Sequence, residues 1–360
     1  MKKILFSAFD MNVGGIETSL VTLLNNLIEK PYDITLVLEK KQGPFLCDLD
    51  NKIKIIEYTP SKNKIVLIRK MINLGKRILF SMKHKNKYDF SVAYSTYSLS
   101  ASFIARTASR NCALWGHADY LALFNGDDKK VEEFFEALHY EKFTHIVFVS
   151  KAGVESFVKI FPEMEDRVLF CNNLVDYKRI QNLSQETINI KKDGYVFINV
   201  GRHDEKQKRL TRIIHATQQL KKDGYNFKVW FIGDGQDSKI YKQLVEEYKL
   251  QDTIEFLGMK KNPYPYMKLA DTVILSSDYE GYPVVFLESF VLNKPIITTD
   301  ISDALLDIQN HFGIVTKKDE NDIYEAMKKM IKQDYKIKEE FLPEEYNKNV
   351  LQKIENLIEY

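Results

Sequence analysis

The sequence lacks the features that mark a secreted, metal-stabilised or membrane-spanning chain. Its only cysteines, Cys47, Cys112 and Cys171, are far apart and share no metal-ligand spacing, which is typical of a reducing compartment. No run approaches the roughly 18 uninterrupted apolar residues of a spanning helix, and the apolar stretch near Met1 is too short for a signal peptide. The net charge is only +2, which leaves no general electrostatic argument for a nucleic-acid partner. We therefore expect a cytoplasmic, globular protein.

The length and composition indicate two domains. With 360 residues the chain exceeds the size at which a single core keeps growing. Hydrophobic residues make up 44% and charged residues 28% of the chain, proportions of a folded protein with a sizeable core.

Short apolar runs alternate with amphipathic stretches along the chain, which is typical of doubly wound parallel α/β sheets. The alternation fades over residues 176–193, which we interpret as a linker between Rossmann-like domains 1–175 and 194–342. Residues 343–360 predict a C-terminal helix that crosses back to the first domain. The expected strands are 3–8, 33–38, 53–58, 90–94, 113–115, 145–149, 195–200, 227–232, 253–257, 272–276 and 295–298. The expected helices before the last are 18–27, 65–80, 131–139, 211–221, 239–248, 283–292 and 320–332.

Residues 62–87 form a basic segment with nine lysines and arginines, one histidine and no acidic residue. Apolar residues recur among them at roughly helical spacing, so the segment predicts a basic amphipathic helix. Two interpretations stay open. The apolar stripe packs on the core and leaves a solvated basic face, or the helix lies on an anionic membrane surface.

A glycine pair, Gly14 and Gly15, follows the first expected strand, and an amphipathic helix begins just after it. Glycine lets a backbone approach a ligand closely, and the free N–H groups of a helix start favour an anion. A turn that merely packs the helix on the sheet is the alternative. The dinucleotide fingerprint needs a third glycine, which is missing here, so an NAD-dependent dehydrogenase is disfavoured.

A basic loop opens the second domain. Arg202 follows the first strand of that domain and Lys208 precedes its first helix, where two cations can neutralise a diphosphate leaving group. For Lys206 and Arg209 we expect solvated side chains. Gly233 ends the next strand in a glycine-flanked turn of the kind that lines a ligand crevice.

Two carboxylates lie in the segment 276–290. Glu280 is in a loop and Glu288 is in the helix that follows, with Pro283 suited to the first turn of that helix. Such carboxylates can bind sugar hydroxyls, while the backbone N–H groups after Pro283 face a phosphate. The acid and nucleophile pair of a glycosidase is the competing chemistry. We disfavour it because the basic loop calls for an anionic ligand.

Five motifs in order resemble those of the family 4 retaining glycosyltransferases, which act in capsule, teichoic acid and lipopolysaccharide assembly. The resemblance covers essentially the whole chain and implies the GT-B fold, in which two Rossmann-like domains face each other across a cleft. The motifs are Gly14-Gly15-Ile16-Glu17, the loop from Gly201-Arg202 to Lys208, Gly233-Asp234-Gly235, Phe256-Leu257-Gly258 and the pattern Glu-x7-Glu from Glu280 to Glu288.

The resemblance also implies a role for each matching residue. Gly14, Gly15, Arg202 and Lys208 would bind the donor diphosphate; Lys206 is an alternative to Lys208, which lies one position beyond the commonest spacing. By the same resemblance, Glu280 would bind hydroxyls of the transferred sugar, Glu288 would bind the ribose, and His117 would contact the donor sugar near its anomeric centre. Gly233 would form the crevice turn, and Gly258 and Met259 would contact the nucleobase. Backbone contacts to phosphate and sugar would come from Tyr282, Pro283, Val284 and Val285.

The activity implied is retaining transfer of a hexose or N-acetylhexosamine from a nucleotide-diphosphate donor, expected to be a UDP-sugar. The implied acceptor is a cell-surface glycan, a teichoic-acid-like polyol-phosphate polymer or a lipid-linked sugar at the inner face of the membrane. No metal and no cofactor are expected, because Arg202 and Lys208 supply the positive charge.

Three alternatives remain open: a nucleotide-sugar 2-epimerase, a sugar phosphorylase of similar fold, and a silent subunit that binds nucleotide sugar. No acid/base set around C2 of a sugar and no pyridoxal-bearing lysine can be identified. The presence of His117, Arg202, Glu280 and Glu288 disfavours a silent subunit.

Overall fold

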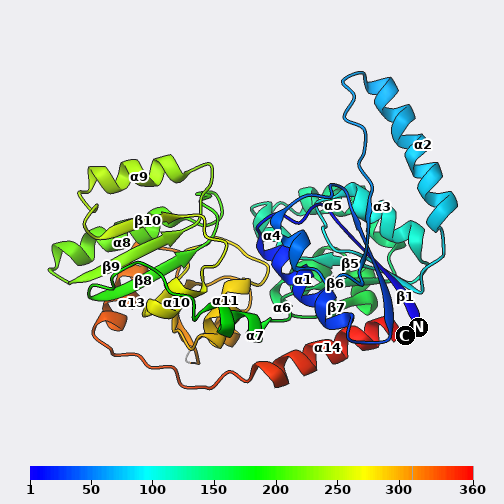
Figure 1. Ribbon diagram of the computed structural model, residues 1–360. Helices are drawn as coiled ribbons and strands as arrows, with labels where there is room; N and C mark the ends of the chain where they lie inside the picture. Colours follow the sequence, from blue (N-terminus) through cyan, green and yellow to red (C-terminus); the bar gives the residue numbers. More distant parts are fainter. Residues whose placement is uncertain (310, 360) are drawn as a thin grey trace. The chain divides into compact units, whose positions relative to one another are not determined.

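The computed structural model describes residues 1–309 and 311–359. The chain forms two compact units, each with its own parallel sheet and covering helices (Figure 1). We call them the N-terminal unit, residues 1–174 with the segment from Asn347 onward, and the C-terminal unit, Val175–Tyr346.

The sheet of the N-terminal unit runs in the order β3-β2-β1-β4-β5-β6-β7, and every pairing in it is parallel. Its strands are β1 (Lys2–Ala8), β2 (Tyr32–Leu38), β3 (Lys54–Glu57), β4 (Phe90–Ala93), β5 (Cys112–Gly116), β6 (His145–Phe148) and β7 (Val168–Phe170). Its helices are α1 (Gly15–Leu27), α2 (Val66–His84), α3 (Leu99–Ala108), α4 (Tyr120–Leu123), α5 (Asp128–Leu138), α6 (Lys151–Ile160) and most of α14 (Pro343–Glu359).

The sheet of the C-terminal unit runs in the order β10-β9-β8-β11-β12-β13, again with parallel pairings. Its strands are β8 (Tyr195–Val200), β9 (Phe227–Ile232), β10 (Ile254–Gly258), β11 (Thr272–Ile274), β12 (Ile296–Thr299) and β13 (Gly313–Thr316). Its helices are α7 (Tyr177–Leu183), α8 (Leu210–Lys222), α9 (Ser238–Glu247), α10 (Tyr264–Leu269), α11 (Val284–Val291), α12 (Ala304–Asp307) and α13 (Glu320–Ile331). The predicted pair of α/β Rossmann-like halves is confirmed.

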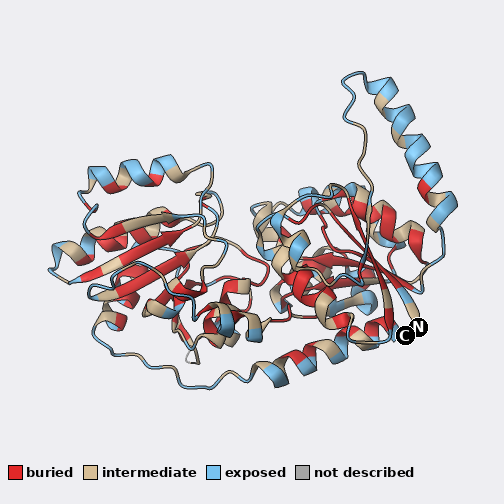
Figure 2. Ribbon diagram, in the orientation of Figure 1, coloured by how far each residue is buried: buried red, intermediate tan, exposed pale blue. Residues whose placement is uncertain are grey.

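Both sheets are buried on both faces, which explains their continuous apolar strands. In β9, for example, the successive residues Val229, Trp230 and Phe231 are all fully buried (Figure 2). Helices supply the covering layers through apolar stripes, such as Ile213 on α8 packed with Met327 on α13. In each sheet the strand order reverses once, between β1 and β4 and between β8 and β11, and ligands bind at such points in open α/β sheets.

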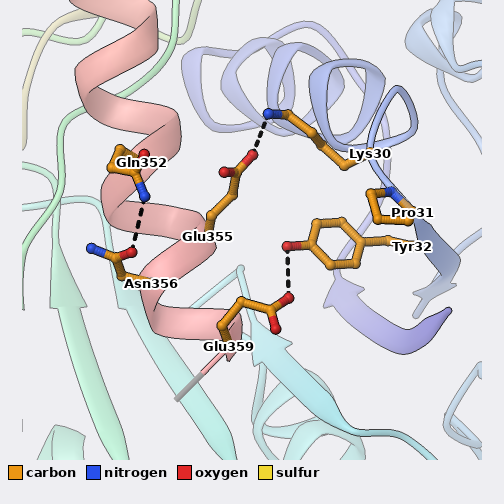
Figure 3. Close-up of a pocket in the computed structure, with 7 residues that line it drawn as sticks. All are labelled: Lys30, Pro31, Tyr32, Gln352, Glu355, Asn356 and Glu359. Carbon is orange, nitrogen blue, oxygen red and sulfur yellow. Dashed lines mark hydrogen bonds and ion pairs between the residues drawn. The ribbon is translucent and has the colours of Figure 1, made fainter.

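The C-terminal helix α14 is attached to the N-terminal unit by polar contacts around Tyr32 (Figure 3). Lys30 Nζ lies 2.5 Å from a carboxylate oxygen of Glu355, and Lys2 Nζ lies 2.8 Å from one of Glu359. The Tyr32 hydroxyl donates to Glu359 Oε1 at 3.1 Å. The helix therefore returns to the first unit, as its apolar stripe predicted.

The segment 176–193, which we expected to be a linker, contains a helix. Asp176 caps α7 by accepting a hydrogen bond from the backbone N–H of Arg179, and Ile180 is buried. The helix packs against α10 and α11 of the C-terminal unit. A short helix with one buried apolar residue leaves little periodicity, so the sequence pattern missed it. Among the described residues, no helix combines the length and apolar content needed to span a bilayer.

Candidate functional site

Four loops gather at one edge of the C-terminal sheet. They follow β8, β9, β10 and β11, which are neighbours in the order β10-β9-β8-β11. Because parallel strands all end at the same edge, the loops meet where the strand order reverses. They carry most of the residues that the sequence singled out in this domain.

Two glycines keep the loops after β8 and β9 in contact. A Cβ atom on Gly233 would lie 1.8 Å from the carbonyl oxygen of Gly201, and one on Gly235 would lie 2.2 Å from that of His203. Gly233 also has φ of 143°, which residues with side chains rarely adopt. The backbone N–H of His203 donates to the carbonyl of Asp234 at 3.0 Å. A side chain at either glycine would separate the loops.

Lys208 and Glu280 form an ion pair with 2.6 Å between Nζ and Oε1, and their side chains are only 20% and 10% exposed. The carboxylate also accepts hydrogen bonds from Ser277 Oγ at 2.8 Å and from Gln207 Nε2 at 3.2 Å. Arg202 is exposed and donates to Gln207 Oε1 at 3.2 Å. The structure thus joins into one cluster three residues to which the sequence gave separate roles, Arg202, Lys208 and Glu280.

Asp278 ties the loop after β11 to the start of α8. Its carboxylate lies 2.6 Å from Arg209 Nε and 2.7 Å from a guanidinium nitrogen of Arg212. Arg209 also pairs with Glu205 at 3.5 Å, so our expectation of a merely solvated side chain is wrong for Arg209. Lys206 is exposed. These ion pairs hold the loops on either side of the Lys208–Glu280 pair.

Glu288 occupies a separate environment on α11. The Tyr264 hydroxyl donates to its Oε1 at 3.0 Å. Burial raises the pKa of Glu288 from 4.5 to about 7, and the hydrogen bond from Tyr264 opposes this rise. The helix begins just after Pro283, so the backbone N–H groups of Val284 and Val285 precede its first internal donors and suit an anion.

The other residues expected at the donor site differ in exposure. Tyr282 is buried and its hydroxyl donates to Asp307 at 2.8 Å, so only its backbone can serve a ligand. Gly258 has φ of 69° and accepts a hydrogen bond from the backbone N–H of Gly233 at 3.1 Å. Met259 is 65% exposed. An exposed apolar side chain beside a turn is compatible with the expected contact to a flat base.

The glycine pair of the N-terminal unit forms the entry to α1. Gly14 is the N-cap residue in an extended conformation, and Gly15 is the first residue of the helix. A Cβ atom on Gly14 would lie 2.3 Å from a carboxylate oxygen of Glu17. The preceding loop is fixed by buried Asp10, which accepts a hydrogen bond from the Asn12 side chain at 2.6 Å. The result is an ordered helix start with free N–H groups.

His117 follows β5 of the N-terminal unit and has one ring nitrogen without a partner. Its Nε2 is buried and makes no hydrogen bond among the described residues, while the ring bonds to the backbone of Tyr94. Burial lowers the pKa of His117 to about 3, so the imidazole is neutral near pH 7. Because the ring bond to Tyr94 favours the protonated form, the ring nitrogen donates there. The free Nε2 of this neutral tautomer can then accept a hydrogen bond from a ligand hydroxyl.

Sequence reasoning missed three polar side chains of these sites. Gln207 and Ser277 flank the residues that were singled out, and their proximity to Lys208 and Glu280 was an available signal. Tyr264 carried no such signal, because it contacts Glu288 from 24 positions away. Among residues 1–309 and 311–359, no group of three or more His, Cys, Asp and Glu side chains is arranged to hold a metal ion.

In the comparison with known proteins, the matched family covers almost the same residues as the C-terminal unit. Residues 181–349 match the family described as Glycosyl transferases group 1. An uncharacterized glycosyltransferase of Methanocaldococcus jannaschii is 30% identical over 168 residues, a match that spans 45% of this chain and 41% of that protein. The N-acetylgalactosamine-N,N'-diacetylbacillosaminyl-diphospho-undecaprenol 4-alpha-N-acetylgalactosaminyltransferase of Campylobacter jejuni is 24% identical over 93% of this chain and 91% of its own length.

The crystal structure of HepE from Anabaena in complex with UDP superposes with a TM-score of 0.75 at 17% identity, covering 99% of this chain and 100% of that one. At this level of identity the superposition establishes the fold. Together with the family match over residues 181–349 and the similar glycosyltransferases, it identifies the chain as a glycosyltransferase of the GT-B fold whose C-terminal unit resembles the group 1 glycosyltransferases.

Proposed function

We propose that this chain moves a hexose or N-acetylhexosamine from a UDP-sugar, with retention of configuration, to a lipid-linked or glycan acceptor. The observation that carries the proposal is the cluster of Arg202, Lys208 and Glu280 at the carboxyl edge of β8 and β11. Glu280 neutralises only one of the two cations, and the N-terminus of α11 adds partial positive charge. The cluster at this edge of the C-terminal sheet therefore carries net positive charge, which suits the binding of a diphosphate.

In the proposed reaction, an oxygen of the acceptor hydroxyl bonds to the anomeric carbon on the face from which the diphosphate oxygen departs. The departing phosphate takes the proton of that hydroxyl. Arg202 and Lys208 stabilise the negative charge that grows on the phosphate as the bond to the sugar breaks. Glu280 holds the Lys208 ammonium in place and accepts a hydrogen bond from a sugar hydroxyl, while Glu288 accepts one from the ribose.

The choice of donor and acceptor draws on similar proteins. HepE was crystallised with UDP, and the name of the Campylobacter jejuni relative includes diphospho-undecaprenol, a lipid-linked acceptor. An acceptor of this kind is held in a membrane. The basic segment 62–87 would attract this chain to an anionic leaflet, where each basic residue contributes on the order of 1 kcal/mol.

Calorimetry with UDP and GDP, followed by transfer assays, tests the proposal. We expect micromolar binding of UDP and weaker binding of GDP, and NMR of the product should show the anomeric configuration of the donor. Lys208→Gln should lower transfer at least about 100-fold, because a cation facing the leaving group is lost. The matched variant Lys206→Gln, at an exposed position in the same loop, should transfer normally. Binding of GDP alone, or inversion, would contradict the donor and stereochemical assignments.

We also propose that transfer needs no metal, since Arg202 and Lys208 supply the positive charge that a divalent ion supplies elsewhere. Transfer rates measured in excess EDTA should equal those in Mg²⁺ or Mn²⁺. Complete loss of transfer in EDTA, restored by Mn²⁺, would overturn this part of the proposal.

A further inference from the structure

Helix α2 exposes an unusual amount of apolar surface. Phe80 is its only buried residue, and the helix extends away from the sheet of its unit (Figures 1 and 2). Isolated exposed apolar residues are common on soluble proteins, whereas a contiguous patch marks an interaction site. The large apolar residues exposed by at least 40% on this helix and its first flanking residue are Ile65, Val66, Leu67, Ile68, Met71, Ile72, Leu74, Ile78, Leu79 and Met82.

One face of α2 is docked on its own unit through one buried apolar side chain, Phe80, and through polar side chains on either side of it. The Asn73 side chain accepts a hydrogen bond from the backbone N–H of Ser61 at 2.6 Å. Phe80 packs edge-on against Tyr58, with ring centroids 5.5 Å apart. His84, one turn further along the same helix, stacks on Phe80, and the Arg77 guanidinium lies over the Phe103 ring of α3, 5.1 Å from its centroid. These contacts fix which side of the helix faces the protein.

The opposite face is apolar. Leu67, Met71, Leu74, Ile78 and Met82 follow one another at intervals of three or four residues, so they lie in one stripe along the helix. At about 100° per residue this stripe points away from the side that carries Asn73, Phe80 and His84. The helix therefore buries only Phe80 on the protein side and presents its apolar stripe to the surroundings, whereas an ordinary surface helix turns such a stripe to the core.

Charge identifies the partner of this stripe. Residues 62–87 contain nine lysines and arginines and no acidic residue, and exposed Lys70 and Lys83 lie outside the apolar stripe. A second copy of this chain would bring an equally basic helix against the first, and like charges would repel. An anionic lipid leaflet satisfies both properties, because its headgroups attract the lysines and its acyl chains accept the stripe.

We propose that α2 inserts its apolar stripe, Leu67, Met71, Leu74, Ile78 and Met82, into an anionic bilayer and lies in the plane of the membrane interface. This extends the proposed function, which rests on a lipid-linked acceptor, by adding insertion to the attraction of charge. Charge attraction alone disappears at high salt, whereas burial of apolar side chains does not. Salt thus separates the two modes of binding.

The first experiment is flotation of the full-length protein with vesicles of phosphatidylcholine alone or mixed with phosphatidylglycerol, in about 0.1 M and about 1 M salt. We expect binding to the anionic vesicles that persists in part at the higher salt. The triple variant Met71→Gln, Leu74→Gln, Ile78→Gln should lower the partition coefficient at least about tenfold at both salt concentrations, because three apolar side chains no longer enter the acyl region. A matched variant with Leu305→Gln and Leu306→Gln, also exposed, should bind like the native chain.

A fluorescence measurement reports insertion directly. The native tryptophans Trp115 and Trp230 are both buried, so a tryptophan introduced at exposed Leu74 (Leu74→Trp) dominates any lipid-dependent change. Its emission should shift to the blue with anionic vesicles and be quenched by brominated lipids, whereas Ile240→Trp on α9 should respond to neither.

Two results would overturn the proposal. Vesicle binding that disappears in high salt, with no blue shift, would mean that charge alone attracts the helix to the membrane. Self-association of the lipid-free protein that the triple variant loses would mean that the stripe binds a second copy of the chain. Calorimetry with UDP is run on every variant. Because α2 lies in the N-terminal unit and the cluster of Arg202, Lys208 and Glu280 lies in the C-terminal unit, unchanged UDP binding separates a failure of membrane insertion from a failure of the proposed transferase function.

Discussion

The carboxyl group of Glu288 should give this protein a measurable pH dependence near neutrality. Burial raises its pKa from 4.5 to about 7, so between these values the folded protein keeps a proton that the unfolded chain releases. Because the pKa of Glu288 is higher in the folded protein than in the unfolded chain, its protonation stabilises the folded protein fully below pH 4.5. This stability is lost as the pH rises through about 7. At about 1.4 kcal/mol per pH unit, the difference corresponds to roughly 3 kcal/mol. Glu288 keeps partial exposure, so this figure is an upper bound.

Urea unfolding at pH 5 and pH 8 of the native chain and of Glu288→Gln measures the effect. The variant cannot titrate at this position, so its free energy of unfolding should fall less between the two pH values, by up to about 3 kcal/mol. Glu246→Gln on α9, an exposed position, is the matched control and should follow the native chain. Parallel pH profiles for the native protein and Glu288→Gln would refute the argument that burial perturbs this carboxyl group.

Ligand binding should change with pH in the opposite direction. A carboxylate accepts a hydrogen bond from a ribose hydroxyl more strongly than a protonated carboxyl group does. UDP affinity should therefore increase between pH 6 and pH 8, while the contribution of Glu288 to stability decreases. The variant Tyr264→Phe removes a hydrogen bond that favours the carboxylate, so it should move the rise in UDP affinity to higher pH.

Two further predictions concern the cluster and the glycine loops. Glu280→Gln removes the charge opposite Lys208 and should lower kcat on the order of 100-fold, measured by steady-state kinetics. Donor affinity, measured by calorimetry, should change less than about threefold. Unchanged turnover would remove Glu280 from the site. Gly235→Ala places a Cβ atom 2.2 Å from the carbonyl oxygen of His203 and should cost roughly 2 kcal/mol or more of stability and weaken UDP binding. Gly75→Ala, where a Cβ atom meets nothing within 4 Å, should be neutral or stabilising in thermal unfolding.

The fold could be predicted because most strands are continuous apolar runs, and parallel sheets require such runs. Helix α3 and strand β7 are among the elements that the pattern missed, and neither has a one-sided apolar stripe. Helix α3 contains small and hydroxyl-bearing residues, and it is buried at Ala101, Ser102, Ile104 and Ala105, so no polar face interrupts it. Strand β7 is only three residues long. Periodicity is informative only where one face meets water and the other meets the core.

The site could be predicted one residue at a time, but its contacts could not. Arg202, Lys208 and Glu280 were identified because loops at the carboxyl ends of parallel strands concentrate chemistry. The ion pair between Lys208 and Glu280 joins positions 72 residues apart, and the clamp of Asp278 on Arg209 joins positions 69 apart. Such pairs depend on which strands are neighbours, and strand order is a property of the assembled sheet. For the same reason Arg209 was expected to be solvated.

The basic segment illustrates a question that periodicity cannot answer. An apolar stripe on α2 is equally compatible with a helix that packs inward and with one that offers its stripe to a membrane, since both give the same spacing along the chain. What distinguishes them is the opposite side of the helix. Phe80 packs on Tyr58 and Arg77 lies over Phe103 on that side, and the stripe that includes Leu74 and Ile78 then faces outward. These contacts fix the docked side of α2, and the apolar stripe on the opposite side is then free to enter a membrane, which is the arrangement that the proposed insertion requires.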